Sequence, residues 1–362
     1  MQSEWGHALR VTVFGASHEK EIGVQMEGLP KGLPVDTDTL QAFLNRRRPG
    51  SFAGSTERKE PDMPVFRTGI KNGKTDGTPL IAVLENRDVS SAPYTRFHDV
   101  PRPSQIDWPA RLRFGDVTDL NGGGHFSGRM TAVYCIAGGI ALQALKSRNV
   151  TVAAHLLSVS AVHDRPFDAV HPDPKELSAI AQKPFPVLDD TAGEAMQQAI
   201  AAAKADGDSL GGVIECAIIG FPQGHGTPLF DGVDSRLASL LFAVPAVRGV
   251  AFGSGFEAAL MTGSAHNDPY VWENGAVRTA TNRHGGLIGG ITTGMPIYLT
   301  VAVKPTASIR KPQKTLDLST KEPTTLTVEG RHDACIAVRA VPVIEAVCAL
   351  ALYDLLLEET VC

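Results

Sequence analysis

The chain has 362 residues, of which 43% are hydrophobic and 20% charged, a composition typical of a folded globular protein. Its formal net charge of −5 argues against a protein that coats nucleic acid or binds an anionic membrane surface, so any anion site requires a local cluster of cations. The five cysteines form no CxxC pair, which favours reduced thiols over disulfides or a metal site. The first residues lack a basic and then apolar signal pattern, and we expect a cytoplasmic protein.

Strands and helices are predicted in an irregular order along the chain. A strand over residues 11–14 runs into a glycine turn, and a helix over 36–48 begins at Asp36 and ends at Pro49-Gly50. Later helices are predicted over 127–146, over 195–204 after a capping box of Thr191 and Glu194, over 230–243, and to Leu357 with Pro342 in the first turn. Further strands are predicted over 212–219, 296–304 and 324–329.

No break in composition divides the chain, so we expect one continuous domain over residues 1–362. The irregular alternation of strands and helices favours an α+β fold or a layered α/β arrangement. The longest apolar stretch lies near residues 346–357 and is interrupted by Tyr353 and Asp354. We expect it to be too short to span a bilayer.

Two early segments carry basic side chains. His18 follows a strand and a glycine turn, where α/β sites commonly lie, and it can exchange a proton near neutral pH, although a lone histidine is more often structural. Arg46, Arg47 and Arg48 suit bidentate binding of carboxylates and phosphates. Cations at a helix carboxyl end are also stabilised by roughly 0.3–1 kcal/mol each, so a solvated helix end is the alternative.

The segment Gly122–Arg129 is a candidate anion site. Its three glycines permit close approach of the backbone, and the helix that follows points free N–H groups at a ligand. Ser127 adds a hydroxyl donor and Arg129 a positive charge. The segment matches neither a Walker loop nor GxGxxG, so a plain glycine turn remains the alternative.

Two late segments add further candidates. Lys304–Ser308 places an ammonium and two hydroxyls on the exit loop of an apolar strand, and the glycine-rich run Gly285–Gly290 precedes that strand. The triplet Arg331-His332-Asp333 stands ahead of the last helix. Its aspartate is either a base in a site or the partner of a structural ion pair.

In this order, these segments resemble chorismate synthase over essentially the whole chain. The matching segments are Phe14–His18, Arg46–Gly50, Arg58–Asp62, Gly122–Arg129, Gly207–Ser209, Pro245–Val250, Gly285–Gly290, Lys304–Ser308, Gly330–Cys335 and Arg339–Pro342. The resemblance implies a layered β-α-β sandwich with helices between sheets, usually assembled as a homotetramer. It also implies a 1,4-elimination of phosphate from 5-enolpyruvylshikimate 3-phosphate to give chorismate, which requires reduced FMN without net redox change.

The resemblance also implies roles for individual residues. His18 would protonate the departing phosphate, and Asp333 would help to remove the proton that the substrate loses. The anions of the substrate would meet Arg47, Arg48, Arg129 and Arg339. The flavin would meet His125, Phe126, Ser127, Pro245, Ala246, Gly289, Lys304, Pro305, Thr306, Ala307, Ser308 and Arg331. Arg47 also matches a position linked to NADPH in relatives that reduce their own flavin.

Several residues depart from the family pattern. Gln105 replaces a second catalytic histidine, and an amide cannot exchange a proton, so His125 is the candidate to take its place. Ala16 and Glu19 replace the usual Glu and Gly beside His18, where a carboxylate would favour the protonated ring. Ala53 replaces an arginine, which weakens the case for NADPH. Two alternatives follow: a non-catalytic relative that binds flavin or a shikimate-type anion, and a flavin oxidoreductase on the same scaffold.

Overall fold

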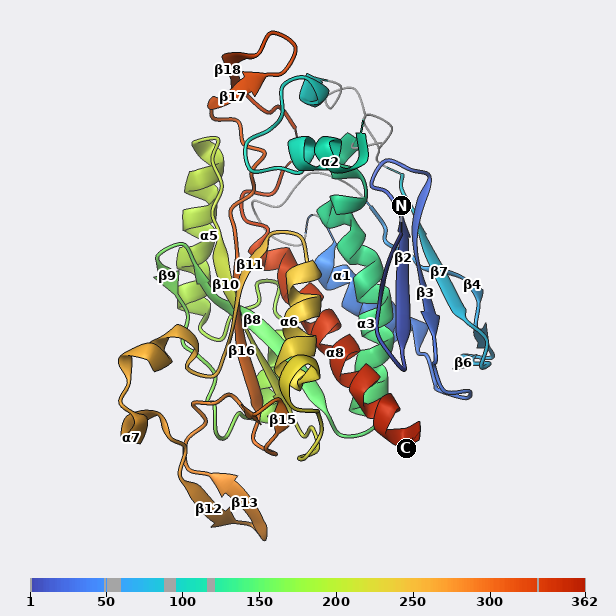
Figure 1. Ribbon diagram of the computed structural model, residues 1–362, viewed down its shortest axis with the longest axis vertical. Helices are drawn as coiled ribbons and strands as arrows, with labels where there is room; N and C mark the ends of the chain where they lie inside the picture. Colours follow the sequence, from blue (N-terminus) through green and yellow to red (C-terminus); the bar gives the residue numbers. More distant parts are fainter. Residues whose placement is uncertain are drawn as a thin grey trace.

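Two antiparallel sheets enclose a layer of helices in the computed structural model of the chain (Figure 1). The structure describes residues 2–48, 50, 60–87, 96–115, 121–330 and 332–361. The first sheet has the order β1 (Gln2–Trp5), β2 (Arg10–Gly15), β3 (Glu21–Glu27), β7 (Leu80–Glu85) and β4 (Val65–Thr68). The second has the order β11 (Val247–Phe252), β16 (Ile297–Val303), β10 (Gly212–Ile219), β8 (Thr151–Val159) and β9 (Val162–His163).

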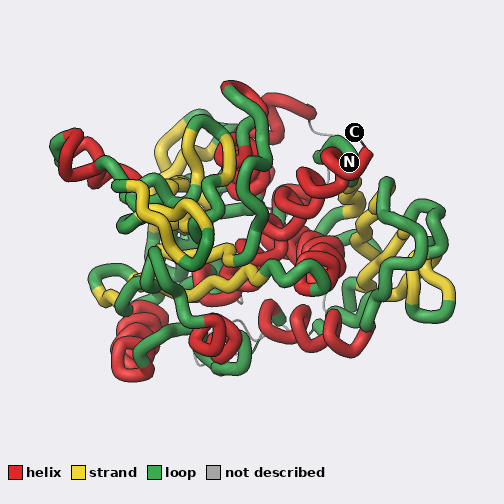
Figure 2. The backbone as a smooth tube through the Cα atoms, turned by 90° about the horizontal axis from the view of Figure 1, so that it is seen from below, coloured by secondary structure: helices red, strands yellow, loops and turns green. Residues whose placement is uncertain are grey.

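The helices between the sheets are α1 (Thr37–Arg47), α3 (Thr131–Lys146) and α8 (Ala337–Val361), with α6 (Val233–Ala243) against α8 and β11. Two of the helices in this layer, α3 and α8, are apolar on most of their surface, whereas α1 buries one side only. Alternate strand residues point at this layer, so Val24 in β3 and Ile214 in β10 are fully buried in the same core. Figure 2 shows the helices in the middle with strands on either side.

The second sheet is covered on its other face as well. α4 (Pro174–Ile180) packs there, since Leu177 and Ile180 form a separate small cluster with Ala153 and Ala217. α5 (Asp190–Ala205) contacts β8 and β9. The remaining elements are α2 (Asp107–Phe114), α7 (Gly263–His266), and the hairpins β5 (Ile70–Lys71) with β6 (Lys74–Thr75), β12 (Tyr270–Glu273) with β13 (Ala276–Thr279), β14 (Leu287–Ile288) with β15 (Ile291–Thr292), and β17 (Gln313–Asp317) with β18 (Glu322–Leu326).

α3 and α8 form the closest helix pair of the core and run in the same direction. A Cβ on Gly138, in the middle of α3, would come within 2.4 Å of the backbone Cα of Ala346, so only glycine permits this contact. Thr131 and Arg339, near the two amino ends, line one cavity. The packing therefore holds both amino ends at the same place in the molecule.

Most predicted elements are confirmed, including the α+β fold with helices between sheets. Asp36 caps α1 and accepts hydrogen bonds from the amides of Asp38 and Thr39 at 2.9 and 3.0 Å. Ser127 caps a short 3-10 turn that leads into α3. The strand over 212–219 has the predicted bounds, and the strand over 296–304 is one residue shorter at each end.

Other boundaries differ more from the predictions. The capping box of Thr191 and Glu194 was wrong, because Asp189 caps α5 and the helix begins at Asp190. The helix predicted over 230–243 begins at Val233, since residues 229–231 form a separate 3-10 turn. The strand predicted over 324–329 is β18, over 322–326. Pro342 is not in the first turn, because α8 already begins at Ala337.

The apolar stretch of α8 is longer than predicted. Its segment Ala337–Glu358 has a mean hydropathy of 2.0 and passes for a membrane span by length and composition. Its most apolar 18-residue stretch is entirely buried inside the protein, so α8 is a core helix. Cys135 and Cys335 are free and buried, and burial raises the pKa of their thiols to about 12 and about 11. Both thiols are therefore protonated and unreactive at neutral pH.

Candidate active site

A cavity of about 370 Å³ lies at the shared amino end of α3 and α8. Segments that are far apart in the sequence contribute its walls, as the sequence analysis expected for a polyanion site. The lining residues are His18, Arg47, Glu60, Arg102, Gln105, Gly122, Gly123, Phe126, Ser127, Gly128, Arg129, Thr131, Val244, Pro245, Ala246, Lys304, Pro305, Thr306, Ala307, Ser308, Glu329, Gly330, His332, Asp333, Ile336, Arg339, Ala340 and Val343.

The charge of the cavity is positive. Among the lining residues that the structure describes, five are cationic and three are acidic, although the whole chain carries a net charge of −5. The amino ends of α3 and α8 add partial positive charge, because their first N–H groups have no partner within the helix. An anionic ligand is therefore favoured here despite the acidic chain.

His18 lies against the glycine turn that the sequence analysis singled out. A Cβ on Gly122 would come within 2.0 Å of Cε1 of His18, and Gly122 has a φ of +61°. Only glycine therefore permits this stacking. Nδ1 of His18 lies 3.1 Å from the Ser17 hydroxyl, which itself donates to the carbonyl of Asn121 at 3.0 Å. These contacts fix the ring at the wall of the cavity, while Glu19 is exposed and does not line it.

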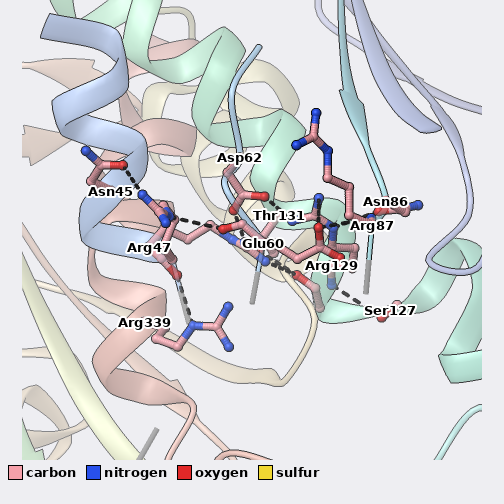
Figure 3. Close-up of polar contacts among 12 residues, drawn as sticks. Asn45, Arg47, Glu60, Asp62, Asn86, Arg87, Ser127, Arg129, Thr131 and Arg339 are labelled. Carbon is pink, nitrogen blue, oxygen red and sulfur yellow. Dashed lines mark hydrogen bonds and ion pairs between the residues drawn. The ribbon is translucent and has the colours of Figure 1, made fainter. Parts of the chain in front are cut away.

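Arg47 and Arg129 share one buried carboxylate, Asp62 (Figure 3). Nη1 of Arg47 donates to Asp62 at 3.0 Å, and Nη1 of Arg129 donates to the other oxygen of the same carboxylate. Arg47 also donates to the hydroxyl of Thr131 at 3.0 Å and the carbonyl of Gly128 at 3.1 Å. The network ties the end of α1 to the start of α3 and aims two cations at the cavity.

These groups shift one another's pKa values. Burial, with help from Arg339 and Arg129, lowers the pKa of Arg47 to about 10, although Asp62 acts in the opposite direction. Burial alone would raise the pKa of Asp62, but Arg47 and Arg129 outweigh it and hold that pKa below the ordinary value. At neutral pH the arginine is therefore charged and the carboxylate ionised.

Arg339 and Asp333 form a second buried pair at the amino end of α8. Nη1 of Arg339 donates to the Asp333 carboxylate at 2.6 Å, and its Nε donates to the carbonyl of Arg47 at 2.9 Å. Both residues line the cavity. The predicted base and the predicted anion-binding arginine are thus direct partners.

The three consecutive arginines of α1 have three different surroundings. Arg46 forms a two-point ion pair with Glu345 in α8, at 2.5 and 2.9 Å, and does not line the cavity. Arg48 donates to the carbonyl of Glu60 at 3.1 Å and to Asn45 at 3.0 Å, and it does not line the cavity either. Of the cluster, the structure places only Arg47 at the site.

The residues assigned to the flavin are only partly brought together. Phe126, Ser127, Pro245, Ala246 and the run from Lys304 to Ser308 line the cavity. His125 does not, because its ring nitrogens lie 2.8 Å from the carbonyl of Gly15 and 3.0 Å from the hydroxyl of Ser3. Gly289 lies in the turn between β14 and β15, away from the lining. Arg331, Ala53 and the pair Arg58 and Lys59 lie outside the described residues.

Arg102 lines the cavity although no sequence pattern predicted it as a site residue. Its guanidinium pairs with Asp107 at 2.7 and 2.9 Å, donates to the Ser308 hydroxyl at 3.2 Å and stacks 4.5 Å from the ring centre of Phe97. The sequence contains the arginine and aspartate five residues apart, but a charged pair at that spacing is common on surfaces. Only the fold, which brings Ser308 to the pair, places Arg102 at the cavity.

Two buried polar atoms of the lining have no hydrogen-bond partner among the described residues. They are the hydroxyl Oγ1 of Thr306 and the ring nitrogen Nε2 of His332. Buried polar atoms are nearly always hydrogen-bonded, so both are suited to a ligand. Lys304 lies two residues before Thr306, and burial lowers the pKa of its ammonium, with Arg248 adding to the effect. This donor set fits a phosphate-bearing cofactor with ring nitrogens and oxygens.

A cation-lined cavity with a histidine, a paired aspartate and two helix amino ends is typical of enzymes that act on a small polyanion. Residues 9–357 match the sequence profile described as chorismate synthase. The chorismate synthase of Thermococcus gammatolerans is 43% identical over 97% of each chain, and that of Lancefieldella parvula is 41% identical over 98% of this chain and 96% of its own. A chorismate synthase crystal structure superposes with a TM-score of 0.76 at 25% identity, covering 98% of this chain and 93% of that one.

The chain belongs to the chorismate synthase family. Its activity is that of a phosphate-eliminating lyase, which forms chorismate in the shikimate pathway of aromatic amino acid biosynthesis. The family uses reduced FMN. The family predicted from the ordered motifs is confirmed, and so is the predicted layered fold.

Proposed function

We propose that the cavity is the active site and that it binds 5-enolpyruvylshikimate 3-phosphate beside reduced FMN. One observation carries the proposal: five described cations and His18 line a single cavity at two helix amino ends. The substrate bears two carboxylates and a phosphate, so it needs several cations around it. Elimination increases the charge on the departing phosphate, which fixed cations stabilise.

We assign the anions of the substrate mainly to Arg129 and Arg339, with Arg47 behind them. Arg129 is hydrogen-bonded to Asp62, and Arg339 is hydrogen-bonded to Asp333. Both guanidinium groups are therefore already oriented before the substrate binds. Three of the five N–H groups of Arg47 go to protein oxygens, which supports a role in positioning its neighbours. Arg48 would need to move to reach the substrate.

Protons move at two ends of the substrate in this proposal. Elimination breaks one C–H bond and one C–O bond. His18 gives a proton to the departing phosphate oxygen, and Asp333 accepts the proton released from carbon. The stacking of His18 on Gly122 and the ion pair of Asp333 keep both groups oriented for these transfers.

For the flavin, we propose Phe126, Ser127, Pro245, Ala246 and Lys304–Ser308 as the holding residues, with Arg331 as a further candidate. The unpartnered hydroxyl of Thr306 supports this assignment. When bound, reduced FMN supplies an electron transiently and recovers it. The apolar side chains of Val244, Ile336 and Val343 would exclude water from the same space.

We further propose that the chain does not reduce its own flavin with NADPH. Arg47, the residue matched to NADPH, is 3% exposed and committed to Asp62, Thr131 and Gly128. Steady oxidation of NADPH by the protein and FMN, without other enzymes, would contradict this proposal and favour the flavin oxidoreductase alternative.

Association into a homotetramer is proposed from the exposed apolar side chains. Phe230, Phe256 and Trp272 are 95%, 87% and 75% exposed, and contacts between subunits would remove these large apolar side chains from water. A mass near four times 38.4 kDa in light scattering is expected.

We also propose that the chain works in the cytoplasm, which suits its buried reduced thiols. We further propose that it folds as one domain, around a core that extends from Leu9 to Leu357.

An anaerobic assay tests the main proposal. Dithionite-reduced FMN and 5-enolpyruvylshikimate 3-phosphate are mixed with the protein, and chorismate absorbance and phosphate release are followed together. Equal amounts of both products are expected, and replacement His18→Gln should lower kcat by about 10²-fold or more. Binding of both ligands by calorimetry without any turnover would favour the non-catalytic alternative.

A further inference from the structure

The cavity holds a second imidazole that the roles above do not use. His332 lines the cavity, and its Nε2 is buried without a hydrogen-bond partner among the described residues. The ring lies against Gly330, where a Cβ would come within 2.7 Å of Nε2. A buried nitrogen without a partner costs free energy unless a ligand satisfies it. The ring is therefore placed to meet a ligand.

The charges around His332 keep its ring neutral while the cavity holds only protein. Burial, together with Arg102 and Arg310, lowers the pKa of His332 to about 4, although Asp333 acts in the opposite direction. Lys304 and Glu329 line the same cavity. An anion bound there would offset the arginines and favour the protonated ring.

Arg102 lies near both His332 and Gln105, the residue that stands where the family has a second histidine. The amide N–H of Gln105 donates to the carbonyl of Arg102 at 3.3 Å, and Gln105 lines the cavity. Nζ of Lys304 donates to the carbonyl of Ser104 at 3.5 Å on the same side. His125 lies outside the lining, with both ring nitrogens in contact with Gly15 and Ser3. Of the described lining residues, His18 and His332 are the two histidines.

We propose that His332 is the proton-exchanging imidazole on the Arg102 side of the cavity and takes the role that Gln105 cannot fill. When the anionic ligands bind, one proton passes from solvent to Nε2, and the new N–H donates a hydrogen bond to the ligand. The inference rests on the proposed function, because it requires the cavity to bind both ligands.

Calorimetry tests the proton uptake directly. Binding of 5-enolpyruvylshikimate 3-phosphate with oxidised FMN is measured at pH 7 in two buffers of different ionisation enthalpy, which gives the number of protons taken up. The wild type should take up about one proton more than His332→Gln. His125→Gln is the matched control and should behave as the wild type. Equal uptake by His332→Gln overturns the inference alone, whereas no binding by the wild type overturns the proposed function as well.

Two further readouts separate proton exchange from a structural role. His332→Gln should lower kcat about 10²-fold, and the double variant with Gln105→His should recover most of that loss, since it restores an imidazole beside Arg102. A structural role predicts no recovery. Nuclear magnetic resonance of the histidine rings uses the wild type alone, so it does not depend on whether a variant folds. One ring should titrate near pH 4 in the free protein and above pH 6 in the complex. A ring that titrates alike in both states contradicts the inference.

Discussion

The middle and the amino ends of the α3–α8 pair are built in opposite ways. In the middle, Gly138 and Ala346 touch through their backbones, and the surrounding side chains are apolar. At the amino ends the same helices border a cavity lined by Arg129, Arg339 and Asp333. The tight middle fixes where the two ends lie, and the ends then carry charges that one ligand can meet. Stability and chemistry are thus carried by different stretches of the same two helices.

Replacement of Arg129 by Met should have the largest effect, because it removes charge at the cavity end of the pair. The variant loses a cation that is aimed at the substrate and leaves Asp62 short of a partner. We expect kcat/KM to fall by about 10³-fold, or roughly 4 kcal/mol of transition-state stabilisation. The anaerobic assay with reduced FMN measures it.

Arg46→Met is the matched control, since Arg46 pairs with a buried carboxylate but does not line the cavity. It should reduce the free energy of unfolding by about 3 kcal/mol through the unpaired Glu345. Its kcat/KM per folded molecule should stay near that of the wild type. A loss of activity in Arg46→Met as large as in Arg129→Met would remove the distinction between the two regions.

Asp62→Asn should reduce the free energy of unfolding by about 3 kcal/mol, because Arg47 and Arg129 lose their shared counter-charge. The pKa of Asp62 is held below its ordinary value of 3.8, so its contribution is present above that value and is lost as the pH falls through the lower folded pKa. Urea unfolding at pH 7, 5 and 3 measures the gap between wild type and variant. It should be constant from pH 7 to 5 and smaller at pH 3, and a gap that closes between pH 7 and 5 would contradict the assignment.

The helices near the α3–α8 pair could be predicted from the sequence where a local pattern determines them. Asp36 and the apolar spacing of α3 were sufficient for those helices, and the ordered motifs identified the family. The surroundings of each arginine could not be predicted, because Arg46, Arg47 and Arg48 are equivalent in sequence. Only the packing of α1 against α3 and α8 distinguishes them. Arg102 and His332 depend on contacts between segments about two hundred residues apart, which no local pattern records.

Gly138→Ala tests the packed middle of the pair. The added methyl would lie within 2.4 Å of backbone in α8, so the helices must move apart, at an expected cost of about 2 kcal/mol in the free energy of unfolding. Gly139→Ala is the matched control, since its methyl meets side-chain atoms and no backbone, namely the end of Leu40 at 2.5 Å and the ring of Phe43 at 3.2 Å. We expect Gly139→Ala to cost at least about 1 kcal/mol less, because side-chain ends can move aside and backbone cannot, while the helix propensity of alanine favours both variants equally. Equal losses in urea unfolding would show that backbone contact does not control this interface.

Pro342→Ala should have the smallest effect, and it concerns the boundary between the two regions. Pro342 lies inside α8, between Arg339 at the cavity and Ala346 in the middle, and it cannot donate to the carbonyl of Val338. Alanine restores that hydrogen bond but makes the unfolded chain more flexible, so we expect a net gain of about 1 kcal/mol in the free energy of unfolding. If the proline also sets the direction of the first turn of α8, KM for the substrate should rise several-fold while stability increases, since Arg339 is displaced. Higher stability with unchanged KM would mean that the ion pair with Asp333 alone positions Arg339.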